Sequence, residues 1–302
     1  MNILITGGLG HIGSKLIKKL SILEMGNLTI VDNLSTHRYC SLFNLDYPIK
    51  FLDKCISEIT VKDLETIDVV IHLAAITNAA GSFKNKEKTE EINLKLTSKF
   101  IKICDKANCK FIFPSSTSVY GAAVDVVDEN NNDYLNPQSP YAETKIGVEN
   151  LLKNYNNDYL ILRFGTIFGT SIGMRFHTAI NKFCYETSLG KPLTIWKENY
   201  NQYRPYLGLN DAISSIIFLI GRKKWNETYN VLTKNYKLSE IVSIINKISS
   251  IKDINWIDTP LINQYSYKVD DTKLKNLGWK SNDDIKECIK NTLEQLKNLK
   301  SK

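Results

Sequence analysis

The chain has 302 residues, of which 43% are hydrophobic and 24% charged, and its formal net charge at pH 7 is +7. This length and apolar share are sufficient for one large α/β domain, or for a domain with a smaller companion. The apolar runs 69–76 and 213–220 are far shorter than the roughly 20 residues of a membrane-spanning helix, so no membrane partner is expected.

Charge and cysteine usage narrow the possible partners and the compartment. Lysines alternate with Asn and Glu over 286–302, as on a solvated helix face, and no aromatic-interleaved basic patch accompanies them, which argues against a nucleic-acid partner. The six cysteines include no C-x-x-C pair and the four histidines lack ligand spacing, so we expect no metal site. The opening apolar stretch is short and has no basic leader, so we expect no signal peptide there. A reducing, cytoplasmic location is therefore predicted.

Strand-like and helix-like segments alternate along the first half of the chain. Strands this apolar are typical of a parallel sheet that is covered on both faces, which is the doubly wound α/β arrangement. We expect this sheet to occupy 1–169 with a returning segment near 205–230, and a smaller, discontinuous C-terminal α/β cap to form from 170–204 and 231–302. The expected strands are 2–5, 28–31, 49–52, 69–73, 110–113 and 159–163, and the expected helices include 12–23, 92–107 and 141–154.

The first strand runs into a glycine-rich turn, Gly7-Gly8-Leu9-Gly10-His11-Ile12-Gly13. Glycines between a strand and a helix remove each Cβ where a pyrophosphate approaches the backbone, and the helix N-terminus supplies free N–H groups. A tight turn without a ligand is the alternative. Asp32 ends the second strand, where a carboxylate can accept from an adenosine ribose hydroxyl and repel a 2′-phosphate. This pattern favours a Rossmann domain that binds NAD, although nearby Arg38 leaves NADP open.

A second motif, Ser139-Pro140-Tyr141-Ala-Glu-Thr-Lys145, opens the helix expected over 141–154. Ser139 is a suitable N-cap with Pro140 in the first turn, so Tyr141 and Lys145 project from one face. An ammonium beside the phenol would lower the tyrosine pKa from its usual value of about 10 and make it a competent base. Ser116, which follows a buried strand, can bring a hydroxyl to the same substrate oxygen. An amphipathic helix with an interfacial tyrosine is the alternative.

Together, these motifs resemble the extended short-chain dehydrogenase/reductases of the NAD-dependent epimerase/dehydratase family, typified by UDP-galactose 4-epimerase. The resemblance covers most of the chain. It implies an NAD-bound Rossmann domain, a substrate-binding cap over a nucleotide-diphosphate sugar, and a homodimer. The further motifs that carry it are Val31-Asp32-Asn33-Leu34-Ser35-Thr36, Asp53, His72-Leu73-Ala74-Ala75, Asn93, Ser-Ser-Thr-Ser-Val-Tyr-Gly at 115–121, Arg163 with Phe168-Gly169, Arg204 before Tyr206, and Asp270-x-x-Lys273.

The resemblance also implies residue roles. Ser116 would donate to a sugar hydroxyl, Tyr141 would take its proton, and Lys145 would tune Tyr141 and hold the nicotinamide ribose. The implied cofactor contacts are Gly7, Gly10, His11, Ile12, Gly13, Asp32, Asn33, Ser35, Thr36, Asp53, Lys54, Leu73, Ala74, Ala75, Asn93, Tyr141 and Lys145. The implied substrate contacts are Thr77, Ser82, Ser116, Thr166, Arg175 and Arg204. Ordinary alternatives are a strand-end turn for Asp53, a helix cap for Asn93 and a structural ion pair for Arg204.

The two residues after Ser116 bear on the reaction. In the family's 4,6-dehydratases an Asp-Glu pair stands at the positions of Thr117 and Ser118, because eliminating water needs an extra acid and base. Its sugar-acid decarboxylases tend to carry a glutamate at the position of Ser118. Both residues are hydroxyls here, which favours an NAD-dependent nucleotide-sugar epimerase that acts at C4 through a transient 4-keto intermediate in polysaccharide biosynthesis. A reductase using NAD(P), a dehydratase or a decarboxylase of the same family, and a non-catalytic dinucleotide-binding sensor remain as alternatives.

Overall fold

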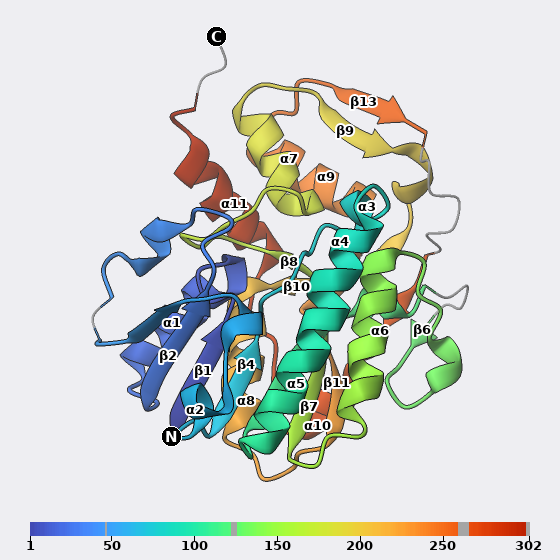
Figure 1. The fold of residues 1–302 in the computed structure, drawn as a ribbon. Coiled ribbons are helices and arrows are strands. Elements are labelled where there is room, and N and C mark those ends of the chain that lie inside the picture. The colour runs from blue at the N-terminus through green and yellow to red at the C-terminus, as the bar shows by residue number, and fades with distance from the viewer. Residues whose placement is uncertain (46, 122–125, 259–265, 300–302) are drawn as a thin grey trace.

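The computed structural model describes residues 1–45, 47–121, 126–258 and 266–299. Its largest layer is a seven-stranded sheet, which can be followed in Figure 1. The strand order is β11-β7-β5-β4-β1-β2-β3, and every neighbouring pair is parallel. This confirms the predicted doubly wound sheet. The strands are β1 Asn2–Thr6, β2 Asn27–Asp32, β3 Lys50–Asp53, β4 Val69–His72, β5 Lys110–Ser116, β7 Tyr159–Phe164 and β11 Glu227–Val231.

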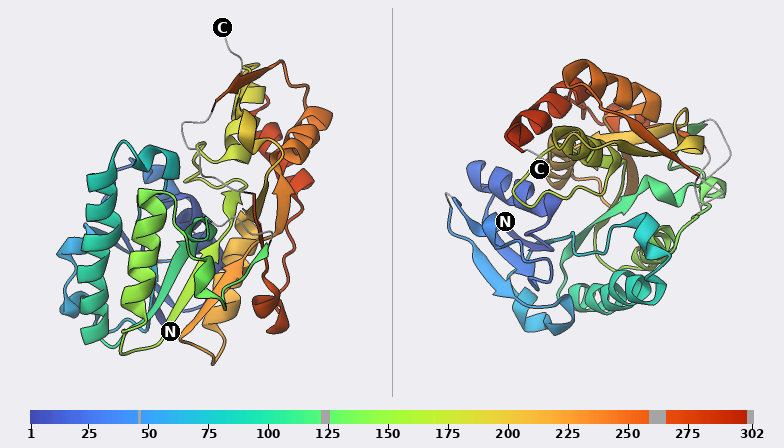
Figure 2. Two further views of the ribbon diagram at one scale, coloured as in Figure 1. Left: turned by 90° about the vertical axis from the view of Figure 1, so that its right-hand side faces the viewer. Right: turned by 90° about the horizontal axis from the view of Figure 1, so that it is seen from above.

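Helices cover both faces of this sheet, because successive strand residues point to opposite sides and both sides are apolar. Ile3 and Ile5 belong to one hydrophobic cluster, whereas Leu4 between them belongs to another. Figure 2 shows the helices between residues 86 and 152, in teal and green, together on one side. The first cluster includes α1 His11–Ile22, α8 Leu209–Ile220 and α10 Thr272–Asn276, and the second includes α2 Val61–Leu64, α5 Thr97–Lys106 and α6 Pro140–Leu152.

The structure differs from the sequence-based elements at two places. The helix expected over 92–107 starts earlier, with α4 Lys86–Glu90, and passes through a π-helical turn, Glu91–Leu96, before α5. Asn93 lies in this turn and its amide holds the backbone of Ile76. The seventh strand, β11, was expected only as part of a returning segment. This strand lacks the continuous apolar run that is typical of a buried strand. Its Asn230 is buried all the same, and the side chain is satisfied by a hydrogen bond to Glu129.

A smaller group of elements lies at the carboxyl end of the sheet and has its own core (Figures 1 and 2). Ile180, Phe183, Ile241 and Ile289 fill that core from three different helices. One sheet has the order β12-β10-β8, and β13 pairs with β9. These elements are β8 Thr166–Phe168, α7 Ala179–Ser188, β9 Leu193–Trp196, β10 Tyr203–Gly208, β12 Lys234–Lys237, α9 Leu238–Ile248, β13 Ile254–Ile257 and α11 Ile285–Leu296.

Short elements complete the described chain. The strands β6 Val126–Val127 and β14 Lys268–Val269 pair with each other in parallel. The short helix α3 Ala79–Ser82 comes directly before α4 in the chain. Within the described residues, no helix is long and apolar enough to cross a membrane. The last residues of the lysine-rich stretch, 300–302, lie outside the described part of the chain.

His72 at the end of β4 is predicted to make the fold acid-sensitive. Its ring nitrogens lie 2.8 Å from the Thr6 hydroxyl and 3.1 Å from the Thr97 hydroxyl. Burial, followed by the charge of Lys145, lowers its pKa from 6.5 to about 3. Between these values the unfolded chain binds a proton that the folded chain does not, so stability is lost as the pH falls. We expect this residue alone to contribute a loss of about 1.4 kcal/mol per pH unit in that window.

Urea denaturation of the wild type and of His72→Gln, at a series of pH values below neutrality, measures this effect. The slope of unfolding free energy against pH should be shallower in the variant. Equal slopes in the two proteins would show that His72 is not responsible.

Candidate active site

A continuous cleft runs along the carboxyl ends of the central strands, beneath the smaller group of elements. It consists of two cavities of about 490 and 350 Å³. Both are lined by Ile12, Leu73, Ala75, Thr77 and Arg175, so they adjoin one another. The chain's strand order reverses between β1 and β4, and such a switch point is where open α/β sheets bind ligands.

The larger cavity begins at the glycine turn before α1. Gly7 has a φ of 63°, and a Cβ there would lie 2.6 Å from the Ala74 nitrogen. A Cβ at Gly13 would lie 2.4 Å from the Gly8 carbonyl oxygen. Gly10 caps α1 without a side chain, so the first N–H groups of the helix remain unobstructed. A bare backbone at a helix N-terminus is the environment that suits a pyrophosphate.

Asp32 at the end of β2 marks the other side of the larger cavity. Its carboxylate accepts from the backbone N–H of Leu9 at 3.1 Å and of Leu34 at 3.0 Å, which fixes its orientation. Each carboxylate oxygen retains a free lone-pair direction that can accept from a ribose hydroxyl. Arg38 also lines the cavity, and its guanidinium donates to the Thr36 hydroxyl at 3.4 Å. The glycine turn and this carboxylate fit a dinucleotide such as NAD.

Most of the predicted cofactor contacts line this cleft. Within the described residues the exceptions are Asp53, which is exposed at the end of β3, and Asn93, which is buried behind the cleft. The Asn93 amide accepts from the Ile76 N–H and donates to the Ile76 carbonyl, both at 2.8 Å, so it acts on the wall of the cleft. Besides Arg38, the lining residues of the larger cavity that were not predicted as cofactor or substrate contacts are mainly apolar. They are Val31, which begins the motif that contains Asp32, and Cys55, Ile56, Ile76, Ile92 and Leu96, with Asn78 and His177 as polar members.

Ser116, Tyr141 and Lys145 all line the smaller cavity. Ser139 caps α6 by accepting from the Ala142 N–H at 3.2 Å, with Pro140 in the first turn as predicted. Ser116 ends β5, and its side chain lies near enough to the Tyr141 phenol to act on the pKa of that group. The helix start and the strand end therefore bring the three side chains to one wall of the cavity.

Lys145 is buried one turn after Tyr141. Its ammonium donates to the Pro114 carbonyl at 2.7 Å and lies 5.7 Å from the centre of the Tyr141 ring. Burial lowers its pKa to about 7, with Glu149 acting to raise it and Arg175 to lower it further. Near neutral pH, Lys145 is therefore poised between its charged and neutral forms.

The pKa of Tyr141 moves in the direction opposite to the one predicted from the sequence. Burial raises it, and the two influences that act to lower it are the charge of Arg175 and the nearby Ser116 side chain. The sequence shows the nearby ammonium, but the loss of water around the phenol is a property of the folded chain. Arg175, which is distant in sequence, is the cation that favours the phenolate here.

Several buried polar atoms of the smaller cavity have no hydrogen-bond partner among the described residues. They are Ser118 Oγ, Thr178 Oγ1 and Arg175 Nε. The other end of the Arg175 guanidinium contacts the Thr77 hydroxyl. Buried polar groups without partners are costly, which indicates that a polar ligand satisfies them. Ser118 and Thr178 were not among the predicted substrate contacts.

Two predicted substrate contacts do not line the described cleft. The Ser82 hydroxyl accepts from the Tyr141 N–H at 3.3 Å and donates to the Ala79 carbonyl at 2.6 Å, so it supports the start of α6. Arg204 donates to the Tyr203 carbonyl at 2.9 Å and the Gln202 side chain at 2.8 Å. By contrast, Thr77, Thr166 and Arg175 lie at the smaller cavity as predicted.

Comparison with known proteins agrees with this geometry. The model of the "NAD dependent epimerase/dehydratase family" matches residues 3–231. The chain belongs to this family. A relative from Dictyostelium discoideum, a dTDP-D-glucose 4,6-dehydratase, is 28% identical over 98% of this chain and 81% of its own length. The predicted family is therefore confirmed, and the relatives include dehydratases.

Solved structures of family members include epimerases with NAD bound. The UDP-glucuronic acid 4-epimerase from Bacillus cereus, in complex with UDP-glucuronic acid and NAD, is 26% identical with a TM-score of 0.89, and the match covers 98% of this chain and 99% of that one. The UDP-N-acetylglucosamine 4-epimerase from Methanobrevibacter ruminantium is 27% identical with a TM-score of 0.86, over 97% of both chains. These neighbours bear out the prediction of an NAD-dependent enzyme.

Proposed function

We propose that this protein is an NAD-dependent nucleotide-sugar epimerase that acts at C4 of the sugar. The observation that carries the proposal is the shared wall formed by Ser116, Tyr141 and Lys145, at the junction with a glycine-lined cavity suited to a dinucleotide. A proton acceptor beside a nicotinamide site can oxidise an alcohol and then reduce the ketone from the other face. The absence of a carboxylate at 117 and 118 favours this reaction over dehydration.

The residues of the cleft divide the chemistry between them. Ser116 donates a hydrogen bond to the sugar hydroxyl oxygen, and Tyr141 takes the hydroxyl proton as the carbon–hydrogen bond is broken. Lys145 and Arg175 offset the negative charge that develops on the phenol. NAD, held by the glycine turn and Asp32, would supply the hydride acceptor for the oxidation and the hydride donor for the reduction. After the 4-keto sugar turns over in the cavity, Tyr141 gives the proton back, so no net oxidation occurs.

A panel of nucleotide sugars incubated with the purified protein and NAD tests the proposal. An isomer of unchanged mass, formed without added reductant, is the expected product. Loss of water would indicate a dehydratase, loss of carbon dioxide a decarboxylase, and a stoichiometric need for NADH or NADPH a reductase.

Arg175 is proposed to bind an anionic group of the substrate. It is half-buried in the cleft, and its Nε is buried and lacks a partner among the described residues. Because a hydrogen bond to a charged group contributes about 1.5–3 kcal/mol, we expect Arg175→Gln to raise KM about 10- to 100-fold. Arg222→Gln, at the far end of α8, is the matched control and should leave KM unchanged.

Comparing neutral sugars with sugar acids locates that anionic group. An equal rise in KM for both places the guanidinium at the diphosphate, and a rise for sugar acids alone places it at the sugar carboxylate. No rise for either substrate would rule out the proposed contact.

We also propose a homodimer in the cytoplasm. The family resemblance supports the dimer, and the six cysteines, all free in the structure, fit a reducing compartment. Light scattering should give twice the chain mass of 34.4 kDa. A monomeric mass would exclude the dimer.

A further inference from the structure

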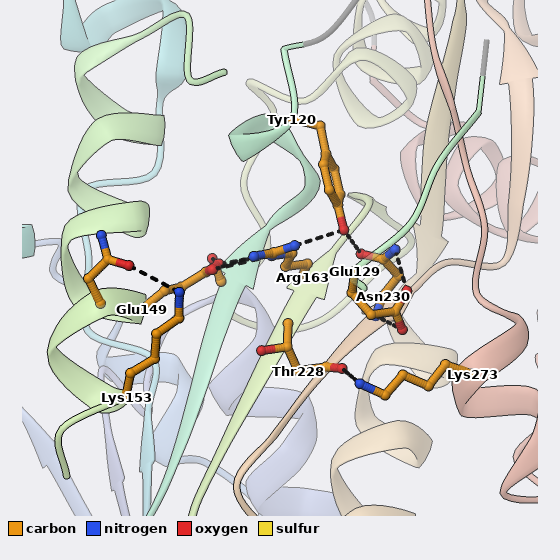
Figure 3. Close-up of polar contacts among 10 residues, drawn as sticks. Tyr120, Glu129, Glu149, Lys153, Arg163, Thr228, Asn230 and Lys273 are labelled. Atoms are coloured by element: carbon orange, nitrogen blue, oxygen red, sulfur yellow. Dashed lines mark hydrogen bonds and ion pairs between the residues drawn. The ribbon is translucent and has the colours of Figure 1, made fainter. Parts of the chain in front are cut away.

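A network of buried polar side chains extends from the active-site helix across the sheet to its edge. Figure 3 shows the contacts running from Glu149 through Arg163 and Tyr120 to Asn230 and Glu129. Arg163 donates from Nε and Nη2 to the Glu149 carboxylate, with the shortest contact at 2.7 Å, and from Nη1 to the Tyr120 hydroxyl at 3.0 Å. Tyr120 donates to Asn230 at 2.7 Å, which in turn donates to Glu129 at 2.8 Å.

The active-site end of this network acts on the catalytic segment. Glu149 lies on α6 one turn beyond Lys145 and is 1% exposed. Its carboxylate accepts from the Ser115 hydroxyl at 2.5 Å, while Lys145 donates to the carbonyl of Pro114. Two successive residues of β5, both directly before Ser116, are therefore held by α6. Tyr141 belongs to the same helix, so these two contacts fix the position of Ser116 relative to the phenol.

We propose that Glu149 is a positioning residue of the active site: its carboxylate, oriented by Arg163 and Ser115, favours the charged form of Lys145 and holds the end of β5 against α6. The proposal rests on the function proposed above. It assigns to Glu149 a role through Lys145 and Ser115, without contact to a substrate. Lys145 needs such a group because its own hydrogen-bond acceptor, the Pro114 carbonyl, is neutral.

The electrostatic surroundings support this assignment. Burial of Lys145 favours its neutral form, and the carboxylate of Glu149 is the influence that opposes this. Arg163 remains charged, because its hydrogen bonds and ion pair with Glu149 outweigh the effect of burial on its pKa. The charged and titratable groups that face Lys145 in the described structure are Tyr141 and Glu149 on α6, Arg175 after β8, and His72 on β4.

The decisive experiment measures the titration of Lys145 directly. Protein labelled with ¹³C at lysine Cε, with NAD bound, is titrated by NMR, and the Lys145 signal is assigned by its loss in Lys145→Met. In Glu149→Gln the midpoint should fall by about one pH unit, since the carboxylate that favours the charged form of Lys145 is lost. The matched control is Glu129→Gln, a buried carboxylate at the other end of the same network, and it should leave the midpoint unchanged.

A second readout connects the titration to turnover. The alkaline limb of the kcat profile should move to lower pH in Glu149→Gln by the same amount and stay in place in Glu129→Gln. Folded Glu149→Gln protein with an unchanged Lys145 midpoint would overturn the inference and leave Glu149 a structural residue only. Because the NMR titration needs no substrate, failure of the proposed epimerase activity would not affect it.

A paired variant keeps the inference testable if Glu149→Gln does not fold. Combining Glu149→Gln with Arg163→Met removes both charges of the buried ion pair, so neither member of that pair is left without its partner. The Lys145 midpoint should still fall, because Glu149 is the nearer of the two groups along the network. An unchanged or raised midpoint in the folded double variant would also overturn the inference.

Discussion

Tyr141→Phe is expected to lower kcat about 10³-fold while leaving NAD binding intact. The substitution removes one oxygen from a side chain that is positioned by Ser116 and by the start of α6. A positioned general base contributes about 10²- to 10⁴-fold to the rate, and no other described side chain of the smaller cavity replaces it at that place. Initial rates at saturating substrate, together with NAD titration by fluorescence, measure the two effects separately.

Tyr155→Phe is the matched control for this prediction. Tyr155 follows α6 at its far end, and its hydroxyl donates to the Cys109 carbonyl at 2.6 Å, away from the cleft. Its loss should cost stability but not turnover. A Tyr141→Phe protein with near-normal kcat would remove the basis for the proposed reaction and favour the non-catalytic, dinucleotide-binding alternative.

The sequence was sufficient for the core of the fold because local patterns determine it. Continuous apolar strands followed by amphipathic helices predict a doubly wound sheet, and the sheet has that form. The glycine turn, Asp32 and the Tyr141/Lys145 spacing each depend on a few neighbouring residues. Their position at one cleft then follows from the parallel topology, since all the strands end at the same edge of the sheet.

Features that depend on distant residues were not predictable in the same way. Arg175 reaches Thr77 across 98 positions of sequence, and Tyr120 reaches Asn230 across 110. No spacing rule links such pairs, because they meet only when separate elements pack. The electrostatic balance of Tyr141 had the same origin: the sequence shows the nearby lysine, but burial is a property of the folded chain.

Arg163 is a motif residue whose role depends on a partner, Glu149, that it meets only in the folded chain. Arg163 was recognised as part of a family motif, yet nothing local specified its partner. In the structure its guanidinium is paired with Glu149 across 14 positions of sequence, and both side chains are nearly inaccessible, at 3% and 2% exposure. An ion pair at such depth depends on both members, because each one compensates the desolvation of the other.

Arg163→Met is therefore expected to lower the free energy of unfolding by about 3–5 kcal/mol, the usual cost of leaving one member of a buried ion pair without its partner. Methionine approximates the apolar stem of arginine but offers no donor to Glu149 or to the Tyr120 hydroxyl. Both groups would remain buried among the strands. Chemical denaturation at neutral pH measures the loss.

Two comparisons separate the loss of a partner from general disruption of the core. Combining Arg163→Met with Glu149→Gln should recover much of the stability, because the unpaired carboxylate is removed as well. Lys95→Met, which breaks an exposed ion pair with Glu91, should change stability by less than about 1 kcal/mol. If Arg163→Met cost no more stability than Lys95→Met, the buried pair would not hold α6 against β7. The contacts of α6 with Pro114 and Ser115 would then lack the support expected from Arg163.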